Sequence, residues 1–276
     1  MTSTHHRTGP GSWFTLALLG AFLTVQLLRG WNGQTQLLVL SSFLMFGCCF
    51  ASAAHLLGVK AALRFALIAL PIGWFAEQMG SSHGWFFGKY TYTDVLGPRV
   101  GDVPLVIPLM WFALGYCGYV IANLIAWQTP SDGVTPVGQS LTMSFLAALV
   151  ITAYDLGVDP YMVYKLKAWE MEKKDGWWFG ETLQGFVGWM LIALTIVFLF
   201  RLSLRKWPPR ASSSLRLRDV QVPLAVYGGL MVFQITQGFP VETRTIATFV
   251  MGIPLFCAIL GLQRWNGAVA PRAEAA

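Results

Sequence analysis

The chain has 276 residues, of which 55% are hydrophobic and only 12% are charged, and its mean hydropathy is +0.56. A soluble domain is typically about 25% charged, so this composition excludes an ordinary soluble domain and indicates a polytopic membrane protein. The net charge of +6 is assigned to orientation in the membrane and not to nucleic-acid binding, because no basic patch interleaved with aromatic residues is present.

Eight stretches of the sequence are long and apolar enough to cross a bilayer as helices, which takes about 20 residues each. We therefore predict an all-α fold, a polytopic transmembrane helical bundle of about eight spans that forms one domain over residues 1–264. The stretch 220–238 is the weakest candidate because polar residues crowd its end, so seven spans is the alternative. The tail at 265–276 and the first eleven residues are predicted to be disordered. The predicted spans are 12–29, 36–58, 61–79, 103–127, 136–156, 182–201, 220–238 and 245–263.

Charge is distributed unevenly between the two ends of these spans. The connection at 202–219 carries five lysine or arginine residues and one acid, and the positive-inside rule places such a loop in the cytoplasm, together with both termini. Ten of the 13 acidic residues fall at the opposite ends of the spans. The segments 77–103, 155–181 and 239–245 therefore meet at one membrane surface, which predicts a polar site at one end of an apolar bundle.

The segment 75–104 is rich in titratable and aromatic side chains, although apolar runs flank it on both sides. Its five glycines interrupt any regular helix, so we predict an interfacial or re-entrant loop. Glu77 is a functional candidate because a carboxylate close to the hydrocarbon is costly; the alternative is a side chain that reaches the headgroups. For the tyrosines and tryptophans the alternative is simple anchoring at the interface. The other candidates in this segment are His83, Trp85, Tyr90, Tyr92 and Asp94.

Two carboxylates four positions apart, Asp155 and Asp159, form the second candidate group. On a helix they share a face. Such a pair suits either acid–base chemistry with one raised pKa or a magnesium–diphosphate site. The alternative is a capped helix end.

The loop 161–181 is rich in aromatic residues, and its charges alternate in sign. This pattern predicts an amphipathic helix that lies on the membrane surface. Trp178 and Glu181, in its last turn, are candidates to reach the polar site.

Two stretches of the chain are similar to a known family. EQMG…GWFFGKYTYTDVLGPRVGDVPLVIPLMW and YDLGVDPYMV…WEMEKKDGWWFGETLQGFVGW resemble two signatures of the carotenoid-biosynthesis integral membrane proteins, which include the γ-carotene and bisanhydrobacterioruberin hydratases. The resemblance is sharp over about 75–190. The matching positions are Glu77, His83, Tyr90, Tyr92, Asp94, Asp155, Asp159 and Glu181.

The resemblance implies an enzyme that adds water across the terminal 1,2 double bond of an acyclic carotenoid end group, as in lycopene or γ-carotene, to give a tertiary alcohol. It also implies a lipophilic carotenoid substrate, a bacterial or archaeal cell membrane, other carotenoid-pathway enzymes as partners, and no cofactor or metal.

Hydration of an isolated alkene requires a strong proton donor to C2, so that the cation forms at the more substituted C1 and water adds there. A carboxylic acid with a raised pKa suits this step. We assign the acid to Asp155 or Glu77 and the orientation of water to Asp94, Asp159 or His83. Aromatic faces stabilise cations. The side chains assigned to this role are Tyr90, Tyr92, Trp85 and Trp178.

Two other classes of protein remain open. The enzymatic alternative is an intramembrane prenyltransferase or a carotenoid cyclase. Asp155 and Asp159 are half of a signature for binding diphosphate through magnesium, and no clear second acidic motif is present. A carotenoid-binding or transport protein is the non-enzymatic alternative, although internal repeats and mid-span charges, which are frequent in transporters, are not evident.

Overall fold

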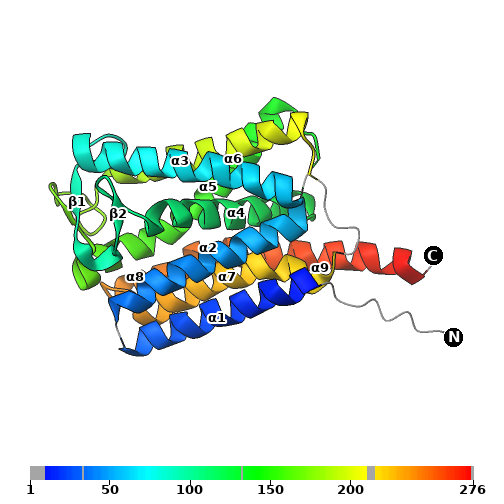
Figure 1. Cartoon of the computed structure of the whole chain (residues 1–276), viewed down its shortest axis with the longest axis horizontal. Helices are drawn as coiled ribbons and strands as arrows, with labels where there is room; N and C mark the ends of the chain where they lie inside the picture. Colours follow the sequence, from blue (N-terminus) through cyan, green and yellow to red (C-terminus); the bar gives the residue numbers. More distant parts are fainter. Residues whose placement is uncertain (1–9, 33, 132, 210–214, 275–276) are drawn as a thin grey trace.

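The computed structural model describes residues 10–274 apart from 33, 132 and 210–214. Over this part of the chain, long helices lie side by side in one bundle (Figure 1). The predicted all-α transmembrane bundle is confirmed. The helices are α1 (Pro10–Asn32), α2 (Thr35–Leu57), α3 (Val59–His83), α4 (Val106–Trp127), α5 (Val137–Pro160), α6 (Leu183–Lys206), α7 (Leu217–Gln237), α8 (Glu242–Val250) and α9 (Gly252–Glu274).

Seven helices in the described chain are long and apolar enough to cross a membrane, with α8 and α9 counted as one continuous stretch. Helix α7 does not meet the requirement for length and hydropathy, although it packs against α1 and α2 within the bundle. The same stretch was the weakest span in the sequence. Residues 265–274, which were expected to belong to a tail, form the end of α9.

Helix α4 lies at the centre of the bundle because it carries no charged residue and is apolar on every side. Every residue from 111 to 124 is buried. The outer helices instead expose large apolar side chains, as lipid-facing surfaces do. Examples are Leu67, Phe145 and Phe256.

Short strands close one end of the bundle, opposite the start of α1 and the end of α9 (Figure 1). Strand β1 (Tyr90–Tyr92) pairs antiparallel with β4 (Trp169–Met171), and β2 (Arg99–Val100) pairs with β3 (Val103–Pro104). The prediction of a surface helix over 161–181 is therefore wrong. That segment holds a π-helical turn at Tyr161–Leu166, strand β4, and a tight turn in which Gly176 pairs with Gly180.

The β2–β3 hairpin is attached to the end of α3 by a hydrogen-bond network. The Gln78 amide donates to Asp102 Oδ2 at 2.7 Å and accepts from the Asp102 backbone N–H at 2.9 Å, while the Ser82 hydroxyl donates to the same carboxylate at 2.8 Å. These bonds hold the pKa of Asp102 below its usual value. They also fix the connection that leads from α3 into α4.

Candidate active site

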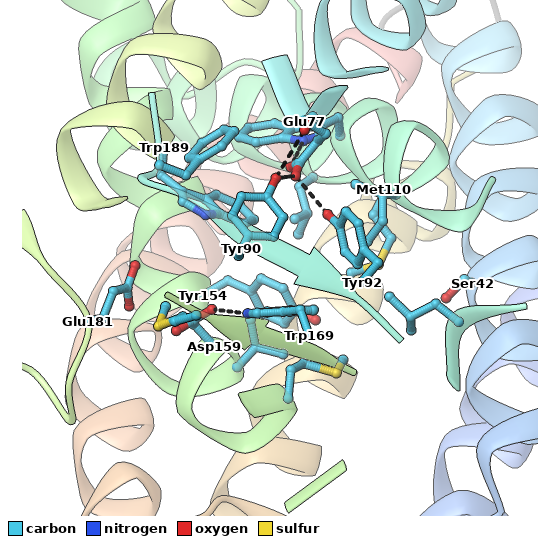
Figure 2. A pocket seen from close by; sticks show the side chains of 18 of the residues that line it. Ser42, Glu77, Tyr90, Tyr92, Met110, Tyr154, Asp159, Trp169, Glu181 and Trp189 are labelled. Carbon is cyan, nitrogen blue, oxygen red and sulfur yellow. Dashed lines mark hydrogen bonds between the residues drawn. The ribbon is translucent and has the colours of Figure 1, made fainter. Parts of the chain in front are cut away.

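Glu77 lies near the end of α3 and is only 5% exposed. Three donors contact its carboxylate (Figure 2): the Tyr90 hydroxyl at 2.5 Å and the Tyr92 hydroxyl at 2.7 Å, both to Oε2, and Trp111 Nε1 at 2.9 Å to Oε1. A carboxylate that accepts several hydrogen bonds is stabilised in its ionised form. Gly73 makes room for this arrangement, because a Cβ at that position would lie 2.7 Å from the Trp111 ring.

The pairing of β1 with β4 explains why both tyrosines point at Glu77. Side chains alternate between the two faces of a strand, so Tyr90 and Tyr92 are buried while Thr91 between them is exposed. Across the ladder Tyr92 lies opposite Trp169, and Tyr90 lies opposite Met171. Burial, and next the charge of Glu77, raises the pKa of both tyrosines well above the usual value, so they remain neutral donors.

A second group of carboxyls lies where α5 meets the loop before α6. Asp155, Asp159 and Glu181 are 1%, 6% and 4% exposed. Asp159 accepts a hydrogen bond from Trp169 Nε1 at 3.1 Å, whereas neither oxygen of Asp155 has a hydrogen-bond partner among the described residues. The i, i+4 spacing of the two aspartates therefore does place both inside the bundle.

Glu181 has little to stabilise its charge. Its Oε2 is buried without a partner in the described chain. Burial, together with the neighbouring charges of Asp159 and Asp155, raises the pKa of Glu181 to about 12. This carboxyl group is therefore neutral at ordinary pH.

One cavity is lined by Glu77, Asp159 and Glu181 (Figure 2). The centre of a water molecule could occupy a volume of about 70 Å³ within it. Most of its wall is aromatic or aliphatic. The ring centres of Trp111 and Trp189 are 4.5 Å apart, and the ring of Phe87 packs on Trp111. The cavity thus combines an apolar wall with carboxyl groups in two different environments. Within the described chain, no group of three or more His, Cys, Asp or Glu residues has the geometry to hold a metal ion.

Five candidate residues do not line this cavity. Asp155, to which the acid was first assigned, is buried in α5 but is not part of the lining. Asp94 is fully exposed and pairs with Arg99 at 2.9 Å. His83 ends α3, packs against the half-exposed Trp85 and does not line the cavity. Trp178 donates to the Leu156 carbonyl at 2.9 Å and therefore fastens the loop to α5.

Three tryptophans of the cavity were missed in the sequence analysis. Trp111 and Trp189 lie inside apolar spans, where a tryptophan looks like core or interface packing. Trp169 falls in the segment that was predicted as a surface helix. One feature of the sequence could have indicated Trp111. Gly73 lies one helical turn before Glu77, and a glycine at that position leaves room for a large side chain, which is Trp111.

The fold and the cavity together define an integral membrane protein with a buried cavity, lined in part by carboxyl groups, at one end of its helical bundle. The sequence model of one family, described as carotenoid biosynthesis protein, matches residues 33–259. The chain belongs to this family, which confirms the resemblance inferred from its two signatures.

A curated relative is the bisanhydrobacterioruberin hydratase of Haloarcula japonica, which is 29% identical over 178 residues. The match covers 61% of this chain and 56% of the relative, so the chain spans little more than half of that protein's length. No solved structure matches the chain.

Proposed function

We propose that the protein adds water to the terminal 1,2 double bond of an acyclic carotenoid end group and so forms a tertiary alcohol. Membership of the carotenoid biosynthesis family and the similarity to a hydratase support this reaction class. The observation that carries the proposal is the contrast between two carboxyl environments in one apolar cavity. Glu77 accepts three hydrogen bonds, whereas Glu181 is neutral beside Asp159. Environments that differ in this way separate an acid from a base.

The first step is transfer of a proton from the Asp159–Glu181 pair to C2 of the alkene. The π electrons form the new C–H bond, and the cation is left at C1. Negative charge remains on the pair, and its attraction for the cation is strong because the surrounding wall is apolar. The faces of Trp111 and Trp189 give further stabilisation to the cation.

The second step is capture of the cation by water. The water oxygen bonds to C1, and Glu77 accepts the proton that the water loses. Tyr90, Tyr92 and Trp111 hold the carboxylate of Glu77 ready for this role. Glu77 is therefore assigned as the base, not as the acid that its position in the sequence first suggested. The cycle closes when the alcohol leaves the cavity, Glu77 releases this proton to the solvent, and the Asp159–Glu181 pair takes up another.

The test is a pigment profile from a bacterium that makes lycopene or γ-carotene and expresses the full chain. We expect a new pigment heavier by one water, detected by liquid chromatography with mass detection. Glu77→Gln, Asp159→Asn and Glu181→Gln should each lower the rate about 100-fold or more, as loss of an acid or base usually does. Asp94→Asn is the matched control, because its carboxylate is fully exposed and outside the cavity, and it should retain activity within about twofold.

The outcome also separates the alternative functions. An unchanged mass with a shifted absorption spectrum would indicate cyclisation, and a gain of five carbons would indicate prenyl transfer. Full activity of all three cavity variants would refute the assignment of the site.

A further inference from the structure

A second, smaller cavity lies next to the main one. Its volume open to the centre of a water molecule is about 10 Å³, and Arg29, Gln234 and Gly238 contribute to its lining. Tyr154 and Val158 line both cavities. Arg29 is in the last turn of α1, and Gly238 immediately follows α7. The small cavity therefore lies between the ends of these two helices and the main cavity.

This small cavity contains polar atoms that the protein leaves without partners. Arg29 is 6% exposed and Gln234 is 3% exposed. Arg29 Nε, Arg29 Nη2 and Gln234 Oε1 are buried and make no hydrogen bond with the described residues. Unpaired buried groups of this kind are costly. They supply donors and an acceptor to one small space.

The remaining contacts of both side chains hold them in place. Arg29 Nη1 donates to Gln26 Oε1 at 3.3 Å, and the guanidinium carbon lies 4.1 Å from the centre of the Phe233 ring. The Gln234 amide nitrogen donates to the Tyr154 carbonyl of α5 at 2.8 Å, and the amide oxygen lies close to Gly157 of the same helix. These contacts hold both side chains beside the small cavity.

A water molecule has the size and chemistry that this cavity requires. An internal water needs about 10–15 Å³ of such volume and two to four polar partners. Arg29 can donate to its oxygen, and Gln234 Oε1 can accept one of its hydrogens. A carboxylate or phosphate could pair with the Arg29 guanidinium, but the cavity is too small to hold either group.

We propose that the cavity between Arg29 and Gln234 binds the water molecule that the hydration consumes and passes it beside Tyr154 into the main cavity. This inference rests on the proposed function. The wall of the main cavity is mainly apolar, so water does not collect there by itself. A polar site next to it supplies one water to the cation while the aromatic faces still shield the cation from bulk solvent.

The experiment separates capture of the cation from its formation. Membranes that contain the full chain are incubated with the carotenoid in heavy water, so that the acid delivers a deuteron to C2. The cation then either bonds to water and becomes the alcohol, or loses a proton and becomes an unhydrated carotenoid that retains deuterium. The ratio of alcohol to deuterated, unhydrated pigment measures the supply of water.

Arg29→Met and Gln234→Leu should lower this ratio about tenfold, while the sum of the two products stays within about threefold of the wild type. Gly157→Ala provides a variant in which both polar residues remain. A Cβ at position 157 would lie 2.2 Å from Gln234 Oε1, so it displaces the amide and should also lower the ratio. Thr236→Val, on an exposed part of α7, is the control and should leave the ratio unchanged.

An unchanged ratio in Arg29→Met and Gln234→Leu would overturn the inference, and so would an equal loss of both products. If the wild-type protein formed neither alcohol nor deuterated pigment, the proposed function itself would fail. The two failures are therefore distinguishable.

Discussion

Glu77 and Glu181 are buried to almost the same degree, yet the groups around their carboxyls differ. Three donors surround Glu77, whereas Glu181 faces other carboxyl groups. The number of donors and the sign of the neighbouring charges thus decide which glutamate suits an acid and which suits a base.

The neutral state of Glu181 predicts how stability depends on pH. Its pKa is about 12 in the folded protein and about 4.3 in an unfolded chain, so the unfolded state binds fewer protons between these values. The contribution of this group is therefore fully present below about pH 4.3 and is lost as pH rises, by up to about 1.4 kcal/mol per pH unit. The apparent unfolding temperature in detergent should fall between pH 6 and pH 9, and Glu181→Gln should make this fall smaller.

Asp102→Asn is the control for this prediction. Hydrogen bonds from Ser82 and Gln78 lower the pKa of Asp102, so its contribution is present above the unfolded pKa of about 3.9 and lost only in acid. Its replacement should leave the change between pH 6 and pH 9 as in the wild type. A steeper fall in Glu181→Gln would contradict the assigned charge state.

At the scale of single elements, the short ladder between β1 and β4 positions the donors of Glu77. Thr91 lies at the middle of β1 with its side chain exposed. A new side chain at this position therefore does not enter the cavity, and a proline tests the backbone pairing alone. Thr91→Pro removes an N–H from the strand. We expect it to lower the proposed hydratase activity at least about tenfold, because proline in a paired strand disturbs the ladder that aligns both tyrosines.

Thr91→Val is the matched variant, because it keeps a β-branched side chain and the N–H. It should retain activity close to the wild type. Pigment turnover per amount of purified protein measures both variants. Equal activity of the proline and valine variants would show that the ladder does not position the tyrosines.

Individual elements also show which features the sequence predicted. The helices were predicted because their apolar runs are longer than about 20 residues, and Glu77, Tyr90, Tyr92, Asp155, Asp159 and Glu181 were candidates because polar groups next to such runs are unusual. Strand β4 was missed because its partner β1 is distant in the sequence and no local pattern reports that pairing. Arg29 looked like a charge at a helix end, and only the packing of α1 against α2 and α7 shows that it is buried.

At the scale of the whole molecule, the number of membrane crossings decides on which side each end of the bundle lies. If α7 crosses the membrane, Asp94 and Glu242 face one side and Lys206 faces the other. Cysteine introduced at each of these exposed positions, in a chain with Cys257→Ser, reports its side through labelling by a membrane-impermeant maleimide. We expect Asp94→Cys and Glu242→Cys to be labelled from the same side, and Lys206→Cys from the cytoplasm.

The buried cysteines Cys48, Cys49 and Cys117 should not react in the folded protein. If Glu242→Cys were labelled together with Lys206→Cys, α7 would not be a span, and the chain would cross the membrane seven times.

The β1–β4 ladder joins residues that are roughly 80 positions apart, and this separation sets the order of events during biosynthesis. A nascent chain is made from its N-terminus, so α1 to α3 and strand β1 leave the ribosome well before β4. During that interval β1 is an unpaired edge that can associate with other chains. The end of the bundle that contains the main cavity is therefore among the last parts to assemble. A chain that stalls after α4 would present Tyr90 and Tyr92 at the membrane surface to quality-control proteases, whereas a completed chain would hide them.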